Sequence, residues 1–166
     1  MQISKKKCVL ITIVALLIFL LCFQIVYIKA KLSFNIDDVL RKENIEDLCL
    51  TIYCRKQGML YSYNWSMDDL LTNYDYKLVM EGKELEQHFD TFRQFNKETI
   101  KYSFKKAKYI DAEIYCILES EKNGKIFDFL SYGITYDIDF TVFFNDINVK
   151  DNDVFITFVK SFISEY

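Results

Sequence analysis

The feature that most constrains this chain is an uninterrupted apolar run at residues 8–28. These 21 residues carry no charge, and only Thr12 and Gln24 have clearly polar side chains. As an α-helix with a rise of about 1.5 Å per residue, the run would be roughly 31 Å long, which matches the hydrocarbon core of a bilayer. The sequence therefore predicts a membrane-spanning signal anchor, preceded by residues 1–7 as a short basic tail.

The lysines that flank this run indicate its orientation. Three lysines precede it together with the α-amino group and two follow it closely: Lys5, Lys6, Lys7, Lys29 and Lys31. Because the more positive flank usually stays in the cytoplasm, we expect a single-pass protein of the cytoplasmic membrane with its N-terminus inside and its C-terminal domain outside. The alternative is a cleaved signal peptide, since residues 28–30 faintly resemble a cleavage site, although the apolar region of such peptides spans only about 7–15 residues.

The remaining chain has the length and composition of one acidic domain. We expect residues 29–34 to be a short juxtamembrane linker and residues 35–166 to form a single core. From residue 32 onward lie all 24 acidic residues but only 16 of the 21 basic ones, which gives a formal charge of −8. This charge argues against nucleic acid or an anionic membrane surface as a partner and leaves a basic protein surface open.

Composition also suggests an ordered domain from a bacterium. The chain contains no proline and only four glycines, which argues against disordered linkers. Its abundance of Ile, Lys, Asn, Tyr and Phe is typical of an AT-rich genome, which favours a bacterial source.

Local patterns predict the elements of the first half of the domain. They are a helix over 35–44 capped by Asn35, a strand over 46–54, a partner strand over 59–64, a helix capped at Ser66, a strand over 76–80 and a helix over 84–95. In the last of these, apolar residues recur at spacings of four, three and three: Leu85, Phe89, Phe92 and Phe95. Such spacing is typical of one continuous amphipathic helix.

The C-terminal third predicts an antiparallel meander. Asn123-Gly124 between two apolar runs favours a type I′ turn, which would place Leu118 opposite Phe129. Residues 134–144 then alternate with a period of two, and a turn at residues 145–146 leads into a strand over 147–150.

The chain ends in a predicted helix with one apolar stripe. Asp151 or Asn152 would cap it, and the stripe consists of Phe155, Phe158, Val159 and Phe162. Together these elements predict an α+β fold: an N-terminal transmembrane helix followed by a mostly antiparallel sheet packed against helices.

The cysteines and the single histidine offer weak chemical signals. Cys49, Cys54 and Cys116 lie outside the apolar run, so they cannot all pair within one chain. We expect small buried side chains, with one disulfide as the alternative. A catalytic thiol would need a base, and His88 lies at the edge of a helical stripe, where a structural role is expected.

No recognisable motif marks a catalytic, metal or cofactor site. Phosphate-binding glycine loops, paired-cysteine zinc patterns and nucleophile elbows are lacking in the sequence, so no cofactor is predicted. Asp137 and Asp139 share one face of a predicted strand, about 6.6–7 Å apart along it, which suits acid-base work or equally a solvated surface.

Aromatic residues favour protein binding instead. Tyrosine and tryptophan are frequent anchors in protein interfaces. The candidate partner surface consists of Tyr61, Tyr63, Trp65, Tyr74 and Tyr76, together with Asp137 and Asp139.

The sequence therefore predicts a membrane-anchored, non-enzymatic, extracytoplasmic protein-binding domain. An immunity protein, or an accessory protein of an envelope or secretion complex, would be a concrete form of it. Two alternatives remain: a small-ligand sensor or carrier with a pocket between helix and sheet, and a hydrolase that uses Asp137 and Asp139.

Overall fold

The chain divides into two compact units, Met1–Lys31 and Leu32–Tyr166. A computed structural model describes residues 5–56, 65–96, 98–107, 111–133, 141–150 and 153–163. The first unit consists of helix α1 (Lys5–Leu32), in which Val9–Leu32 is long and apolar enough to cross a membrane. The apolar run is thus helical as predicted, and the helix includes residues 29–32 of the expected linker.

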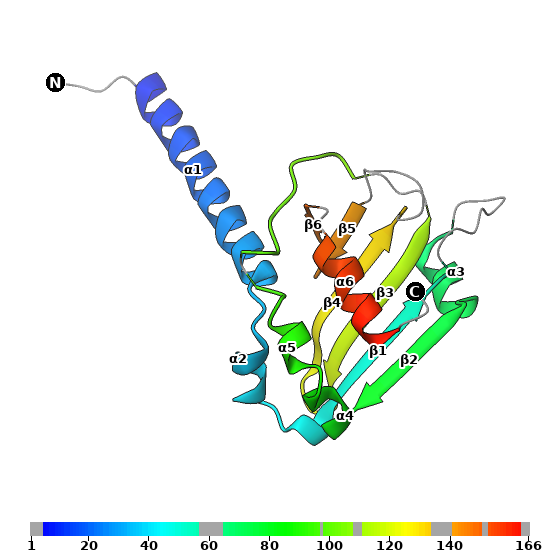
Figure 1. Ribbon diagram of the computed structural model, residues 1–166. Helices are drawn as coiled ribbons and strands as arrows, with labels where there is room; N and C mark the ends of the chain where they lie inside the picture. The colour runs from blue at the N-terminus through cyan, green and yellow to red at the C-terminus, as the bar shows by residue number, and fades with distance from the viewer. Residues whose placement is uncertain are drawn as a thin grey trace. The chain divides into compact units, whose positions relative to one another are not determined.

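The second unit is an α+β domain, as predicted (Figure 1). Its elements are α2 (Ile36–Leu40), η1 (Ile45–Asp47), β1 (Leu48–Cys54), α3 (Met67–Thr72), β2 (Tyr76–Glu81), α4 (Lys83–Glu86), α5 (Phe89–Phe92), β3 (Ala112–Ser120), β4 (Gly124–Tyr132), β5 (Thr141–Phe144), β6 (Ile147–Val149) and α6 (Asp153–Phe162). The described strands form one sheet in the order β2-β1-β3-β4-β5-β6, with every neighbouring pair antiparallel. The predicted C-terminal meander is therefore confirmed.

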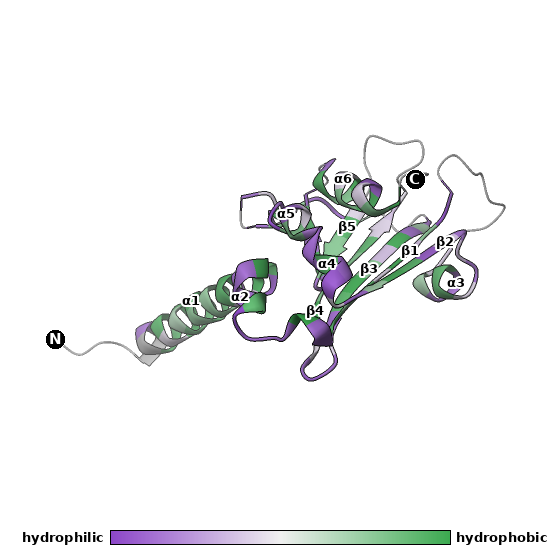
Figure 2. Ribbon diagram, turned by 60° about the horizontal axis from the view of Figure 1, so that its bottom comes forward, coloured by the Kyte–Doolittle hydropathy of each residue, from purple (hydrophilic) through white to green (hydrophobic). Residues whose placement is uncertain are grey.

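One face of the sheet, called the covered face here, packs against α4, α5 and α6 (Figure 2). Phenylalanine rings fill the space between helices and strands; the fully buried ones are Phe92, Phe95, Phe127, Phe129, Phe144, Phe155 and Phe158. The ring of Phe95 lies within 6.0 Å, centroid to centroid, of the rings of Phe127, Phe129 and Phe158. Aromatic contacts between elements far apart in sequence therefore form the main core.

The other face, called the open face here, packs against α3 at one end. Leu70 of α3 is fully buried against Ala112 and Tyr115 of β3. Farther along the same face, Lys77, Val79 and Glu81 of β2 are exposed. Strand alternation thus sends apolar side chains to the covered face and a mixture of tyrosines and charges to the open face.

Caps and stripes that depend on nearby residues are confirmed. Asn35 accepts a hydrogen bond from the amide of Asp37 at the start of α2, and Ser66 and Asp69 form a capping box at α3. The stripe of α6 is buried at Phe155, Phe158 and Val159 as predicted, while Asp151 and Asn152, its predicted caps, lie outside the described residues.

The single helix predicted over 84–95 is wrong. The structure has two four-residue helices there, α4 and α5, separated at Gln87 and His88. Leu85 and Phe92 are both buried, because two successive turns satisfy the same spacing as one continuous helix. The ring of His88 stacks on the ring of Phe162, with 4.4 Å between the ring centroids. This is a packing contact, the kind of structural role that was expected for this histidine.

The type I′ turn predicted at Asn123-Gly124 is also wrong. Among these two residues only Gly124 has a positive φ, +73°, and Leu118 pairs with Phe127 instead of Phe129. From Ile114 to Leu118 the register differs from the predicted one by two residues, and a further irregularity lies between Leu118 and Glu119. A shift of two residues leaves side chains on the same face of the sheet. The side-chain amide of Asn123 donates to a carboxylate oxygen of Glu43 at 2.7 Å, a long-range contact that the local turn signal could not include.

A turn with two positive φ angles occurs instead between β5 and β6. Asn145 and Asp146 have φ of 48° and 67°, and Phe144 pairs with Ile147 across them. This is the geometry of a two-residue type I′ hairpin, so the predicted turn at this point is confirmed.

The described partners of β1 are β2 on one edge and β3 on the other. The partner strand was predicted at residues 59–64. Those residues, like residues 134–140 of the predicted alternating strand, lie outside the described residues.

Candidate functional site

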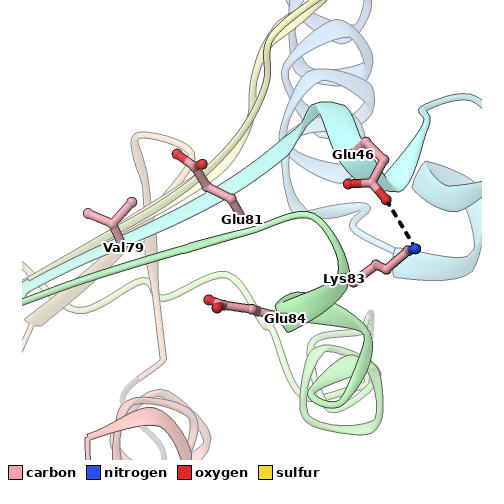
Figure 3. A pocket seen from close by; sticks show the side chains of 5 residues that line it. All are labelled: Glu46, Val79, Glu81, Lys83 and Glu84. Carbon is pink, nitrogen blue, oxygen red and sulfur yellow. Dashed lines mark ion pairs between the residues drawn. The ribbon is translucent and has the colours of Figure 1, made fainter.

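A cluster of carboxylates lies at one end of the sheet, where β1 begins and β2 and β3 end. Its carboxylates, called the acidic rim here, are Glu46, Asp47, Glu81, Glu84, Glu119 and Glu121. They line two adjoining hollows of about 550 and 420 Å³, which share Glu46 and Glu81. Figure 3 shows the larger hollow, with Val79 and Glu81 on the same side of β2.

Antiparallel pairing brings these residues together. Cys49 pairs with Glu81 on one side and with Glu119 on the other, so carboxylates of β2 and β3 flank the start of β1. The amide of Gly82 donates to the carbonyl of Leu48 at 3.1 Å, which holds the end of β2 beside η1.

A tight backbone turn places Glu46 at the centre of the rim. Gly82 has φ of +54°, and a Cβ atom there would lie 2.7 Å from a carboxylate oxygen of Glu46. Glycine at this position therefore permits both the turn and the close approach of the carboxylate.

Little positive charge offsets the rim. Among the described residues, Lys83 is the only lysine that lines either hollow; its Nζ lies 3.9 Å from Glu46, and both side chains are largely exposed (Figure 3). An exposed pair at this distance contributes little stability and stays accessible to a competing cation. The rim therefore presents a net negative surface.

Glu43 adds a further negative charge beside the rim. Hydrogen bonds from Ser120 Oγ (2.6 Å) and from the Asn123 amide (2.7 Å) lower its pKa below the usual value of 4.5. These bonds favour the ionised form, so Glu43 keeps its charge to a lower pH than a free glutamate would.

The rim does not resemble a metal or catalytic centre. Within the described ranges, no three His, Cys, Asp or Glu side chains are grouped closely enough to hold a metal ion. Desolvation raises the pKa of the half-buried Cys49 thiol, and the nearby Glu81 raises it further. A thiol that stays protonated at neutral pH is a poor nucleophile.

The other two cysteines of the domain, Cys54 and Cys116, are buried small side chains. Cys54 and Cys116 are fully buried on the covered face, and both are free, as is Cys49. Burial raises the pKa of Cys54 to about 12 and that of Cys116 well above its usual value. The structure thus favours the predicted role of small buried hydrophobes over a disulfide.

A third hollow, called the tyrosine hollow here, lies on the open face beside α3. Its volume is about 280 Å³, and its lining consists of Met67, Tyr115, Asp128, Leu130, Tyr132, Phe143 and Asp146. Tyr115 donates its hydroxyl to Asp128 Oδ2 at 3.3 Å, and Lys125 Nζ lies 3.0 Å from the same oxygen. Burial, followed by the charge of Asp128, raises the pKa of Tyr115.

The predicted partner surface does not form one patch in the described residues. Trp65 is buried, with the guanidinium of Arg55 4.0 Å from its ring centroid. Tyr76 is half-buried and pairs with Cys54, which places it on the covered face. Tyr74 is exposed and packs edge-on against Tyr53, 5.4 Å between ring centroids.

The other four predicted residues lie outside the described ranges: Tyr61, Tyr63, Asp137 and Asp139. Their roles stay predictions. The acidic rim was missed, because its six carboxylates come from η1, α4, the end of β2, the end of β3 and the residue that follows β3. The only sequence signal was the presence of acidic residues at strand ends, which is common in solvent-exposed turns.

Comparison with known proteins found no matching family model, no matching curated protein and no matching solved structure. The structure defines the class of protein: an α+β domain that follows a helix long and apolar enough to cross a membrane. Its activity must be inferred from its own residues.

Proposed function

We propose that this chain is a membrane-anchored, non-enzymatic, extracytoplasmic domain that binds a basic surface of another protein through the acidic rim. The observation that supports this best is the gathering of six carboxylates around two open hollows, with one described lysine, Lys83, lining the larger hollow. A basic toxin, or a basic subunit of an envelope or secretion complex, would fit such a surface.

Electrostatics explains how the rim would act. Complementary charge steers a basic partner toward the surface and raises the association rate, an effect that falls steeply with ionic strength. The anchor confines the domain to the membrane, so a partner that works there meets it at a raised effective concentration. The rim therefore needs neither a deep pocket nor a reactive side chain.

Charge reversal of the rim tests this function. The full chain, captured from its own membranes, should retain a basic protein that is lost when Glu46→Lys, Glu119→Lys and Glu121→Lys are combined. The matched control reverses three exposed acids outside the rim, Glu86, Glu98 and Asp153, and should retain the partner. Equal loss in both variants, or equal retention, would refute a role for the rim.

The proposed orientation has its own test. Positive charge before the anchor supports an outside location for the domain, and a membrane-impermeant thiol reagent on intact cells can check it. Cys49 is half-buried, whereas Cys54 and Cys116 are fully buried, so urea that leaves the membrane closed should increase labelling. Labelling only after lysis would place the domain in the cytoplasm.

The tyrosine hollow favours a second candidate function, a small-ligand sensor or carrier. Its aromatic walls and two carboxylates resemble a binding site, although 280 Å³ is at the small end of the usual range. The pocket predicted between helix and sheet is not supported, because phenylalanine rings fill that space. A ligand in the hollow should raise the melting temperature in proportion to the logarithm of its concentration, and Leu130→Trp should abolish that rise.

A further inference from the structure

The two edges of the sheet differ in what covers them. Beyond β6, Tyr102 forms an antiparallel bridge with Val149. Two backbone hydrogen bonds flank this bridge: the amide of Ser103 donates to the carbonyl of Asn148, and the amide of Lys150 donates to the carbonyl of Lys101. Beyond β2, none of the described residues forms a strand or a bridge. An uncovered edge strand offers unpaired amides and carbonyls to another strand.

The backbone register identifies which residues offer those groups. The amide of Gly82 donates to the carbonyl of Leu48, so even-numbered residues of β2 form the bonded pairs with β1. The amides and carbonyls of Lys77, Val79 and Glu81 therefore point outward, away from β1.

The side chains of the same three residues are self-complementary. All three are exposed on the open face, and Val79, an apolar side chain, is 45% exposed. Lys77 and Glu81 carry opposite charges and lie two residues to either side of Val79. A two-fold axis through Val79 would therefore place each lysine opposite a glutamate.

We propose that a second copy of this chain docks on this edge by antiparallel pairing of β2 with β2, centred on Val79. Val79 then faces the partner's Val79, Lys77 faces the partner's Glu81, and the three facing pairs exchange their outward amides and carbonyls. Two salt bridges on one face of the joined sheet flank an apolar contact, and opposite charges across paired strands are favourable.

Charge also selects this register over the two others that are centred on an outward-pointing residue. A two-fold axis through Lys77 or through Glu81 would use outward-pointing backbone groups equally well. Those registers would place two lysines or two glutamates directly opposite each other, which is unfavourable. Of the three outward-pointing residues, Val79 is the centre that avoids a pair of like charges on the axis.

The membrane makes so small an interface workable. One strand pair of six residues buries far less than the roughly 1,200 Å² of a stable protein interface, so the isolated contact should be weak. Chains anchored in one bilayer meet at a high effective concentration. A larger fraction of them is therefore paired, although the affinity of the contact itself is unchanged. The test therefore uses the full chain in lipid vesicles.

Charge exchange is the first experiment. Full chains carrying donor or acceptor dye at the N-terminus are mixed in zwitterionic vesicles at a fixed protein-to-lipid ratio, and energy transfer is measured. Lys77→Glu alone places glutamates opposite glutamates, and Glu81→Lys alone places lysines opposite lysines. Each variant should associate about fivefold or more weakly than the parent chain.

A mixture of the two single variants is the decisive sample, because the first offers two glutamates and the second two lysines. We expect transfer between them to return to the parent level. Transfer no greater than in either variant alone would overturn the proposal. Both positions are exposed, and an unchanged circular dichroism spectrum checks the fold; α1 is identical in every sample, so any helix association cancels.

Cross-linking tests the register in a chain with Cys8, Cys22 and Cys49 replaced by alanine. Val79→Cys should form a dimer under mild oxidation, because facing residues of a bonded pair lie about 5.5 Å apart between Cα atoms. Lys77→Cys should not, since its copies would lie four residues apart along the strands, roughly 13 Å. Equal cross-linking of the two variants would refute the register.

Lys77→Glu also separates this inference from the proposed function. It leaves every carboxylate of the acidic rim in place, so a basic partner should still be captured while self-association is lost. Loss of both would indicate that an extended segment of the partner, rather than a second copy, occupies the edge, and would overturn the proposal.

Discussion

The two faces of the sheet are made by the same strands but follow different chemistry. On the covered face, Phe127 and Phe129 meet Phe95 of the segment after α5 and Phe158 of α6, and all four rings are fully buried. On the open face, Tyr115 packs against α3 through its ring while its hydroxyl reaches Asp128.

The difference shows how this chain divides its aromatic residues. Most of the buried phenylalanines fill the face where helices exclude water, and Tyr115 and Tyr132 lie on the face where the far end of the side chain still reaches a polar partner or solvent. Tyr76 on the covered face and Phe143 on the open face are exceptions. The open face therefore keeps hollows, charges and an edge strand that no described residue pairs with, and the candidate functions are found there. The predictions below test this division, beginning with the largest expected effect.

Truncation of the central ring of the covered face should be the most damaging change. Phe95→Ala removes a fully buried ring with several aromatic neighbours and should lower the free energy of unfolding by about 3–5 kcal/mol. Phe104→Ala is the matched control, because Phe104 is 91% exposed and should change stability by less than about 0.5 kcal/mol. Urea unfolding of the full chain in detergent measures both; equal losses would contradict the assignment of the core.

The buried thiols of the covered face should make the domain sensitive to alkali. The pKa of Cys54 is raised from 9.0 to about 12 in the folded domain, so its contribution to stability is complete below pH 9 and is lost as the pH rises toward 12. Between pH 8 and pH 10 the titration of this thiol should lower the free energy of unfolding by about 1.4 kcal/mol.

The measurement is the change in unfolding free energy between those two pH values. Cys54→Ala lowers stability at both pH values but should reduce the loss between them by that amount. A variant whose loss equals that of the parent chain would show that the thiol titrates normally. Cys116→Ala should act in the same direction, since burial raises its pKa as well.

Features that depend on neighbouring residues were predictable from the sequence. Alternation assigned β1, and helical spacing assigned the stripe of α6. Ser66 and Asp69 indicated their capping box because both partners lie within one turn. In each case the contact that decides the structure is local.

Features that depend on distant residues were not predictable. The pairing of β2 with β1 joins segments separated by α3, and the turn at Asn123 responds to Glu43, 80 residues away. The break between α4 and α5 leaves the spacing of buried residues unchanged, so periodicity could not detect it. The acidic rim exists only after the sheet order is known, which is why sequence reasoning chose tyrosines instead.

The cap of α3 should have a smaller effect, confined to the open face. Ser66 Oγ accepts from the amide of Asp69 at 3.2 Å. The Asp69 carboxylate accepts from the Ser66 hydroxyl at 2.7 Å and from the Ser66 amide at 2.9 Å, and these two bonds lower the pKa of Asp69. Ser66→Ala should reduce stability by about 1 kcal/mol and raise that pKa. Thr72→Ala, at the exposed end of the same helix, is the control and should stay within about 0.5 kcal/mol; similar losses in both would argue against a specific cap.

The smallest effect concerns two buried serines at the covered face. Ser120 donates to Glu43 at 2.6 Å and so lowers its pKa, whereas Ser131 Oγ has no hydrogen-bond partner in the described part of the chain. Because the folded pKa is depressed, the contribution of Glu43 to stability is present above its unfolded value of 4.5 and is lost as the pH falls through the folded pKa.

Ser120→Ala should therefore raise the pKa of Glu43 and make stability less dependent on pH below 4.5, as read from the NMR titration of its side-chain carboxyl carbon. Ser131→Ala should leave that pKa unchanged and should be neutral or slightly stabilising, because it removes a buried hydroxyl without breaking a bond in the described structure. If both variants shifted the titration equally, the hydrogen bond from Ser120 could not be its cause. A shift in the first variant alone would show that the edge of the covered face helps to keep Glu43 charged beside the acidic rim.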